Sequence, residues 1–255
     1  MRAIAVVLVT ALGVPVGAVL NLLIDRVPSK AALRGARDGE ARPPVGWGGV
    51  PAQPWLLRGR RREGEPLPRR WLWVELATAA TFAGLALAYR DPWVLVPLLV
   101  LGACLVTVSV IDLQLQRIPD RITFPTLAVA LPLVAVASTR LDSTEAIKAA
   151  VIGSVVYFGI LCVTHLVYPA GMGFGDVKLA LVMGLYLGWL GWVPGSAVLG
   201  PVRLVLYALM LGSMVGVVFG LAHQALTKQR GAFAFGPALA VGCLTVVLFA
   251  GDLRG

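Results

Sequence analysis

Two aspartates stand at the edges of long apolar stretches, and no other residues of this chain are better suited to chemistry. Asp112 closes one apolar stretch, and Asp176 opens another within the segment Gly-Phe-Gly-Asp. Carboxyl groups beside membrane segments are costly, so they are candidates for function by default. The two residues lie 64 positions apart in the sequence. We predict that both lie at the same depth, at one membrane boundary.

The chemistry available to two neighbouring carboxyl groups is acid–base catalysis. Like charges held close together cannot both form easily, so one carboxyl group keeps its proton. The ionised partner can take a proton from water, while the protonated one polarises a peptide carbonyl group. Such a pair titrates as a unit. Asp112 and Asp176 therefore form a candidate catalytic pair for aspartic proteolysis.

The glycines before Asp176 allow two interpretations. Gly171, Gly173 and Gly175 leave a backbone without side-chain walls, which an extended substrate could approach closely. The alternative is a flexible turn in which Asp176 caps the N-terminus of a helix. The tetrapeptide Gly-x-Gly-Asp alone does not decide between these interpretations.

The composition limits the class of protein to which these residues belong. The chain has 255 residues, of which 58% are hydrophobic and 14% are charged, against about 25% charged in a typical soluble domain. This excludes a soluble globular protein and a disordered one. Three cysteines do not suggest a disulfide framework. The composition predicts an all-α, polytopic membrane protein.

Eight apolar stretches approach the length of about 20 residues that a membrane helix needs. They are residues 3–24, 71–89, 93–111, 122–138, 149–168, 177–193, 204–223 and 235–251. Several glycines repeat four positions apart, a spacing that lets helices pack closely in lipid. These are Gly13/Gly17, Gly184/Gly188 and Gly212/Gly216/Gly220.

The basic residues predict the orientation in the membrane. Residues 25–70 form a long loop with eleven Lys and Arg against five Asp and Glu, which suits contact with anionic lipid. With this loop inside, sixteen of the 22 basic residues lie inside and both termini lie outside. We predict a first helix at 1–24, a basic loop at 25–70 and a seven-helix domain at 71–255. A cleaved signal peptide is the weaker interpretation of the first segment, because its apolar run is too long.

Three further charged groups lie near the predicted helices. Asp120 and Lys178 are candidate supporting residues, and Lys178 either steadies the carboxylates or meets lipid phosphate. Glu75 lies one turn into the second predicted helix, where a nearby arginine such as Arg70 would offset the cost of its burial.

The two aspartate segments together resemble a known family. The residues that carry the resemblance are Asp112 with Pro119-Asp120, Thr123 and Pro125, and residues 173–179 with Gly188-Trp189. Further similar stretches are residues 17–28, Arg70 with residues 74–76, and residues 235–237. In this order they resemble the bacterial type IV prepilin peptidases, membrane aspartic proteases of the Gly-x-Gly-Asp class.

The resemblance implies a reaction and a location. The family cleaves the short basic leader from prepilins and pseudopilins on the cytoplasmic side of the bacterial inner membrane. By position Asp112 and Asp176 would be the catalytic pair, with Asp120, Gly173, Gly175 and Lys178 in support. Many members also methylate the new N-terminus with S-adenosylmethionine.

One feature departs from the family. Many members carry two Cys-x-x-Cys pairs in the long loop, which suit a structural zinc. Residues 25–70 contain no cysteine, and Cys104, Cys162 and Cys243 all lie within apolar stretches. We therefore predict no zinc and no other metal, and we leave methylation open.

Two other classes of function remain as alternatives. A proton- or ion-coupled transporter could use Asp112 and Asp176 as a relay, but the sequence has no second copy of either segment, as transporter repeats would need. A non-catalytic assembly protein could use the basic loop for docking, and both acids would then be replaceable. The sequence names no individual prepilin and gives no oligomeric state.

Overall fold

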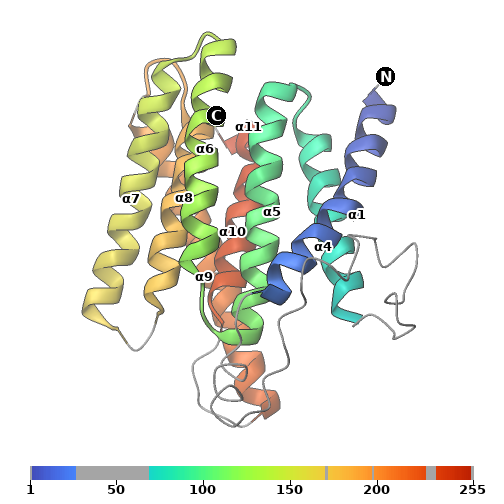
Figure 1. Cartoon of the computed structure of the whole chain (residues 1–255). Coiled ribbons are helices and arrows are strands. Elements are labelled where there is room, and N and C mark those ends of the chain that lie inside the picture. The colour runs from blue at the N-terminus through green and yellow to red at the C-terminus, as the bar shows by residue number, and fades with distance from the viewer. Residues whose placement is uncertain (1, 27–68, 170–171, 197, 228–233, 254–255) are drawn as a thin grey trace. The chain divides into compact units, whose positions relative to one another are not determined.

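A computed structural model of the chain describes residues 2–26, 69–169, 172–196, 198–227 and 234–253. Nearly all of these residues are helical (Figure 1). The helices are α1 (Arg2–Arg26), α4 (Arg69–Ala88), α5 (Pro92–Leu115), α6 (Asp120–Arg140), α7 (Glu145–Val167), α8 (Phe174–Gly191), α9 (Leu199–Thr227), α10 (Gly236–Leu248) and α11 (Ala250–Leu253). Most of the predicted basic loop lies outside the described residues, as does Gly171.

Within the described ranges, seven helices are long and apolar enough to cross a membrane. This confirms the prediction of an all-α multi-pass membrane protein. The eighth predicted span corresponds to α10, which has 13 residues. That is about 20 Å of helix, short of an apolar layer of about 30 Å. The helix ends at Leu248, Phe249 is its C-cap residue, and the short helix α11 follows.

The described residues form two compact units, Met1–Leu87 and Ala88–Gly255, here called the N-terminal and C-terminal units. In the N-terminal unit the backbones of α1 and α4 approach closely. A Cβ atom at Gly17 would lie 2.6 Å from the Cα atom of Glu75, and one at Gly13 would lie 2.5 Å from that of Ala79. The structure therefore confirms that this glycine pair serves helix packing.

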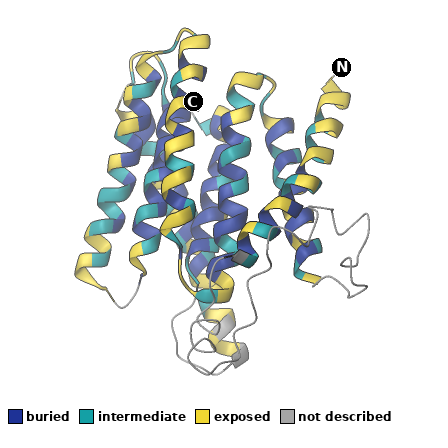
Figure 2. Cartoon of the chain, viewed as in Figure 1, coloured by how far each residue is buried: buried dark blue, intermediate teal, exposed yellow. Residues whose placement is uncertain are grey.

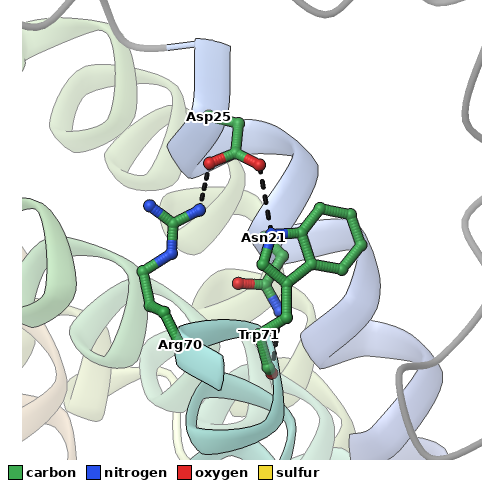
Figure 3. Close-up of polar contacts among 4 residues, drawn as sticks. All are labelled: Asn21, Asp25, Arg70 and Trp71. Carbon is green, nitrogen blue, oxygen red and sulfur yellow. Dashed lines mark hydrogen bonds and ion pairs between the residues drawn. The ribbon is translucent and has the colours of Figure 1, made fainter. Parts of the chain in front are cut away.

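Polar residues continue the contact between α1 and α4 at the end next to the predicted loop (Figure 3). The amide nitrogen of Asn21 donates to the carbonyl oxygen of Trp71 at 3.0 Å. Asp25 forms an ion pair with Arg70 and accepts a hydrogen bond from the Trp71 ring nitrogen at 3.1 Å. These four residues join the end of α1 to the start of α4.

The C-terminal unit is arranged around α8. This helix packs against α5, α6, α7, α9 and α10, and 78% of it is buried, against 22% to 50% for the other six candidate spans among the described residues. Figure 2 shows the contrast between α8 and the outward faces of α6 and α7, which are largely exposed. A central helix of this kind can carry polar groups that a lipid-facing helix cannot.

Glycines bring α7 and α8 into backbone contact. A Cβ atom at Gly153 would lie 2.5 Å from the Cα atom of Gly188, and one at Gly184 would lie 2.8 Å from that of Ser154. The Ser154 hydroxyl donates to the carbonyl oxygen of Leu181 at 2.8 Å. The pair Gly184/Gly188 therefore packs helices within one chain, as its spacing predicts.

Candidate active site

Asp112 lies in the last turn of α5. The helix begins after Asp91, whose carboxylate accepts the Trp93 N–H at 2.8 Å. It ends at Gln116, which has a left-handed backbone with a φ of 50° and donates its N–H to the carbonyl oxygen of Asp112 at 2.7 Å. Asp112 itself is only 5% exposed. The end of α5 therefore holds this carboxyl group inside the C-terminal unit.

The backbone of α10 holds the Asp112 side chain. The N–H of Gly236 donates to Oδ2 of Asp112 at 2.9 Å, across 124 positions of sequence. A Cβ atom at Gly236 would lie 2.8 Å from the same oxygen, so only glycine allows this approach. Gly236 lies in the stretch 235–237 that resembles the family, but that resemblance gave it no role at the site. Its other signal in the sequence is the following Pro237, a residue suited to the first turn of a helix.

Asp176 lies in the first turn of α8. Its N–H donates to the carbonyl oxygen of Gly173 at 3.1 Å, and the residue is 6% exposed. Among the described residues, its Oδ1 atom has no hydrogen-bond partner. A buried carboxylate oxygen without a donor is costly. Such an oxygen is well placed to accept a proton or to bind a water molecule or a substrate.

The structure corrects the bounds of the predicted glycine loop. Phe174 and Gly175 belong to the first turn of α8, so the loop ends at Gly173. Gly173 occupies the N-cap position with an extended backbone, and Asp176 is the third helical residue. Asp176 is therefore not the N-cap residue itself, but its carboxylate lies beside the N–H groups of the first turn, so the alternative in which it stabilises the helix N-terminus stays open. The helix starts early because its first turn packs against the connection between α5 and α6.

The fold brings Asp112 and Asp176 together. They come from the C-terminal end of α5 and the N-terminal end of α8, and they lie close enough to interact electrostatically. Both are almost fully buried. Two buried carboxyl groups that interact in this way can act as base and acid on a peptide bond.

The supporting residues predicted near the pair also come together. A Cβ atom at Gly175 would lie 2.8 Å from the Cβ atom of Ile118, so α8 begins directly against the α5–α6 connection. Lys178 Nζ contacts both carboxylate oxygens of Asp120 at 2.7 Å. Lys178 therefore pairs with Asp120, and the structure does not decide between the two roles considered for it, toward the Asp112/Asp176 carboxylates or toward lipid phosphate.

One further residue near the site was not singled out by the sequence. The Nδ1 atom of His165 donates to the carbonyl oxygen of Met172 at 2.8 Å, and its ring lies 5.4 Å from the ring of Phe174. These contacts join the last turns of α7 to the residues that precede α8. His165 therefore helps to place the start of the helix that carries Asp176.

The other acids near the predicted helices belong to the N-terminal unit. Asp25 is the partner of Arg70 there. Glu75 is fully buried at the α1–α4 contact. That a nearby arginine offsets the free-energy cost of burying Glu75 stays a prediction. Arg70, the arginine considered for this role, forms an ion pair with Asp25.

No group of three or more His, Cys, Asp or Glu side chains in the described part of the chain could hold a metal ion. Cys104, Cys162 and Cys243 are separate free thiols in α5, α7 and α10. The prediction that the chain needs no zinc is left as a prediction.

Comparison with known proteins adds an independent finding. Residues 99–221 match the sequence model described as the type IV leader peptidase family. This range contains Asp112, Asp120, Asp176 and Lys178. No solved structure matches the chain.

Curated relatives cover more of the chain than this model does. A protein of Klebsiella pneumoniae is 30% identical over 69% of this chain and 82% of its own length. One of Xanthomonas campestris pv. campestris is 26% identical over 95% of this chain and 90% of its own. One of Aeromonas hydrophila is 30% identical over 75% of this chain and 63% of its own, so the chain spans just under two thirds of that relative. Each of the three is named prepilin leader peptidase/N-methyltransferase.

Proposed function

This chain belongs to the type IV leader peptidase family, and from that premise we propose that it is a membrane aspartic endopeptidase for prepilins or pseudopilins. It removes the leader peptide, with Asp112 and Asp176 as the catalytic pair. The observation that carries the proposal is the burial of these two carboxyl groups, within electrostatic reach of one another, at one end of the C-terminal unit. The names of the relatives support the substrate class.

The proposed mechanism needs only the two carboxyl groups and a water molecule. The ionised carboxylate takes a proton from water as the oxygen attacks the scissile carbonyl carbon, and the protonated carboxyl group donates its proton to the carbonyl oxygen. When the resulting gem-diol collapses, the carboxyl group that took the water proton gives it to the leaving amine, the C–N bond breaks, and the other carboxylate takes a hydroxyl proton back, which restores the pair. No covalent intermediate with the enzyme forms. Gly173 has an extended backbone beside Asp176, which suits contact with an extended substrate.

We place the site at the cytoplasmic face of the bacterial inner membrane, with the N-terminus on the outer side. A C-terminus on the outer side as well requires the short helix α10 to make the eighth crossing. The distribution of Lys and Arg supports this orientation, since sixteen of the 22 fall on the side of the 25–70 loop. The basic leader of a prepilin would remain in the cytoplasm. Its apolar helix would enter the membrane beside the enzyme.

The transporter alternative has less support. A relay across the membrane needs ionisable groups spread through the depth of the bundle. Asp112 and Asp176 instead lie together at the ends of their helices. Family membership also favours a peptidase over a transporter.

Methylation of the new N-terminus is a separate question, because the names of the relatives include an N-methyltransferase. S-adenosylmethionine would supply the methyl group to the amine that cleavage releases. The 25–70 loop lacks the cysteines of many relatives, so we restrict the proposal to proteolysis. Mass spectrometry of the processed substrate decides, since methylation adds the mass of one methyl group.

The test is co-expression of the full chain with candidate substrates that carry a basic leader before an apolar helix. Type IV prepilins, secretion pseudopilins and competence prepilins form the panel, and processing is measured as a gel shift. Wild type is compared with Asp112→Asn and Asp176→Asn. The control is Asp142→Asn, because Asp142 is an exposed turn residue with a φ of 49° that asparagine also adopts.

We expect wild type and Asp142→Asn to process at least one class of substrate, and both catalytic variants to process none at equal membrane levels. Processing by either catalytic variant at the wild-type rate would contradict the assignment of the pair. Failure of wild type to process any member of the panel would contradict the substrate class.

A further inference from the structure

The first observation concerns the connection between α5 and α6. It contains residues 116–119 and begins four residues after Asp112, so it continues directly from the end of α5 that carries this residue. Ile118 in this connection is 6% exposed. It lies so close to Gly175 that no side chain fits at that glycine. Ile118 follows Asp112 in the chain and Gly175 precedes Asp176. The contact between Ile118 and Gly175 therefore joins the segments that carry the two proposed catalytic residues.

The second observation is the ion pair that flanks this contact. Asp120 is the first residue of α6, and Lys178 lies in the second turn of α8. Both carboxylate oxygens of Asp120 lie 2.7 Å from Lys178 Nζ. The same nitrogen lies 5.3 Å from the ring centre of Phe174 and 5.7 Å from that of Phe124. The lysine is thus held by a carboxylate and two aromatic rings, from both α6 and α8.

The lysine distinguishes this pair from an ordinary surface ion pair. The Lys178 side chain is 23% exposed and that of Asp120 is 54% exposed, while Lys148 and Glu145, which pair three residues apart on α7, have side chains 73% and 56% exposed. Exposed pairs contribute little, because water and salt screen them. A half-buried lysine that contacts both oxygens of one carboxylate and lies beside two aromatic rings makes a stronger and more directional contact.

We propose that Asp120 and Lys178 form a clamp that holds the α5–α6 connection against the first turn of α8 and so sets the position of Asp112 relative to Asp176. The clamp joins elements that lie 58 positions apart in the sequence. Among the described residues, neither Asp120 nor Lys178 forms a hydrogen bond or ion pair with Asp112 or Asp176, so we assign both as positioning residues. This role rests on the proposed peptidase function.

The kinetic test is a double-mutant cycle on the full chain in detergent or nanodiscs. The variants are Asp120→Asn, Lys178→Met and the double variant, assayed on a prepilin-like substrate that wild type cleaves. Methionine keeps the apolar stem of the lysine and removes its charge. The control is the matched exposed pair on α7, as Lys148→Met with Glu145→Gln.

We expect each single variant to lower kcat by about tenfold or more, because small displacements of catalytic groups cost rate, with KM nearly unchanged. The double variant should be no slower than the slower single variant, since each residue acts through the other. The control should match wild type. Losses that multiply in the double variant, or an effect mainly on KM, would overturn the clamp because they indicate separate contacts with substrate.

A second measurement does not depend on catalysis. In Ile118→Cys, the new thiol lies at the contact that the clamp covers, and its labelling by a water-soluble maleimide is measured against the parent chain with its three native cysteines. We expect labelling to be several-fold faster when Asp120→Asn is added, and unchanged when Glu145→Gln is added. Equal labelling with and without Asp120→Asn would overturn the clamp. If wild type cleaves no prepilin but labelling depends on Asp120, the clamp stands and the proposed substrate class fails.

Discussion

The two units of the molecule hold acidic side chains in different ways. In the N-terminal unit, Asp25 faces a guanidinium group and an indole N–H, so both of its oxygens have donors. In the C-terminal unit, Asp112 has a backbone donor on one oxygen, and Asp176 has an oxygen without a partner among the described residues. An acid with a donor on each oxygen suits a structural role, whereas two interacting acids, one with an oxygen that lacks a donor among the described residues, suit acid–base chemistry.

The strongest test of this difference is to neutralise Asp112 and Asp176 one at a time. We expect Asp112→Asn or Asp176→Asn to lower kcat by about 10³-fold or more, because each removes one half of the acid–base pair. Single-turnover cleavage of a purified prepilin-like substrate measures the loss. The chains should still reach the membrane at wild-type levels, since asparagine has nearly the same shape. A variant that keeps more than a tenth of the rate would place the acid–base chemistry elsewhere.

The next effect tests how Asp112 is held. Gly236→Ala places a Cβ atom 2.8 Å from the Asp112 carboxylate, so the side chain or α10 must move. We expect kcat to fall by about ten- to a hundredfold. The matched control is Gly159→Ala in α7, where a Cβ atom meets nothing within 4 Å. Equal kcat for both alanine variants would show that the approach of α10 does not position Asp112.

The smallest expected effect is that of neutralising Asp25, the acid that has a donor on each oxygen. Asp25→Asn keeps an oxygen for the Trp71 ring nitrogen but removes the charge that pairs with Arg70. Because both side chains are partly exposed, we expect a loss of about 1 kcal/mol in stability and little change in kcat. Thermal unfolding in detergent, followed by tryptophan fluorescence, measures the first and the cleavage assay the second. A loss of rate as large as that of Asp112→Asn would remove the distinction between the two kinds of acid.

The features that the sequence could predict are those whose signal comes from residues close together in the chain. Apolar runs mark the helices, and a carboxyl group next to such a run is expensive enough to suggest a function, which identifies Asp112 and Asp176. Glycines four apart likewise predict close helix contacts. In each case the signal lies within a few turns of chain.

The parts that could not be predicted depend on contacts between distant segments. The donor to Asp112 lies 124 positions away in Gly236, and the partner of Asp120 lies 58 positions away in Lys178. Residues that lie so far apart in the sequence form no periodic pattern from which their contact could be predicted. The early start of α8 at Phe174 was missed for a similar reason, because a run of alternating glycines predicts a loop until the packing against Ile118 is known.

The enclosed position of α8 has a consequence for the biogenesis of this protein. Of the seven candidate spans among the described residues, α8 has the lowest mean hydropathy, 1.3, and it carries Asp176 and Lys178 near its start. Charged residues oppose entry of a single helix into lipid. Its glycine face fits α7, the span made just before it, with backbone in contact. The two helices are therefore expected to enter the bilayer as a hairpin, so the order of synthesis delivers Asp176 to the membrane already shielded by its neighbour.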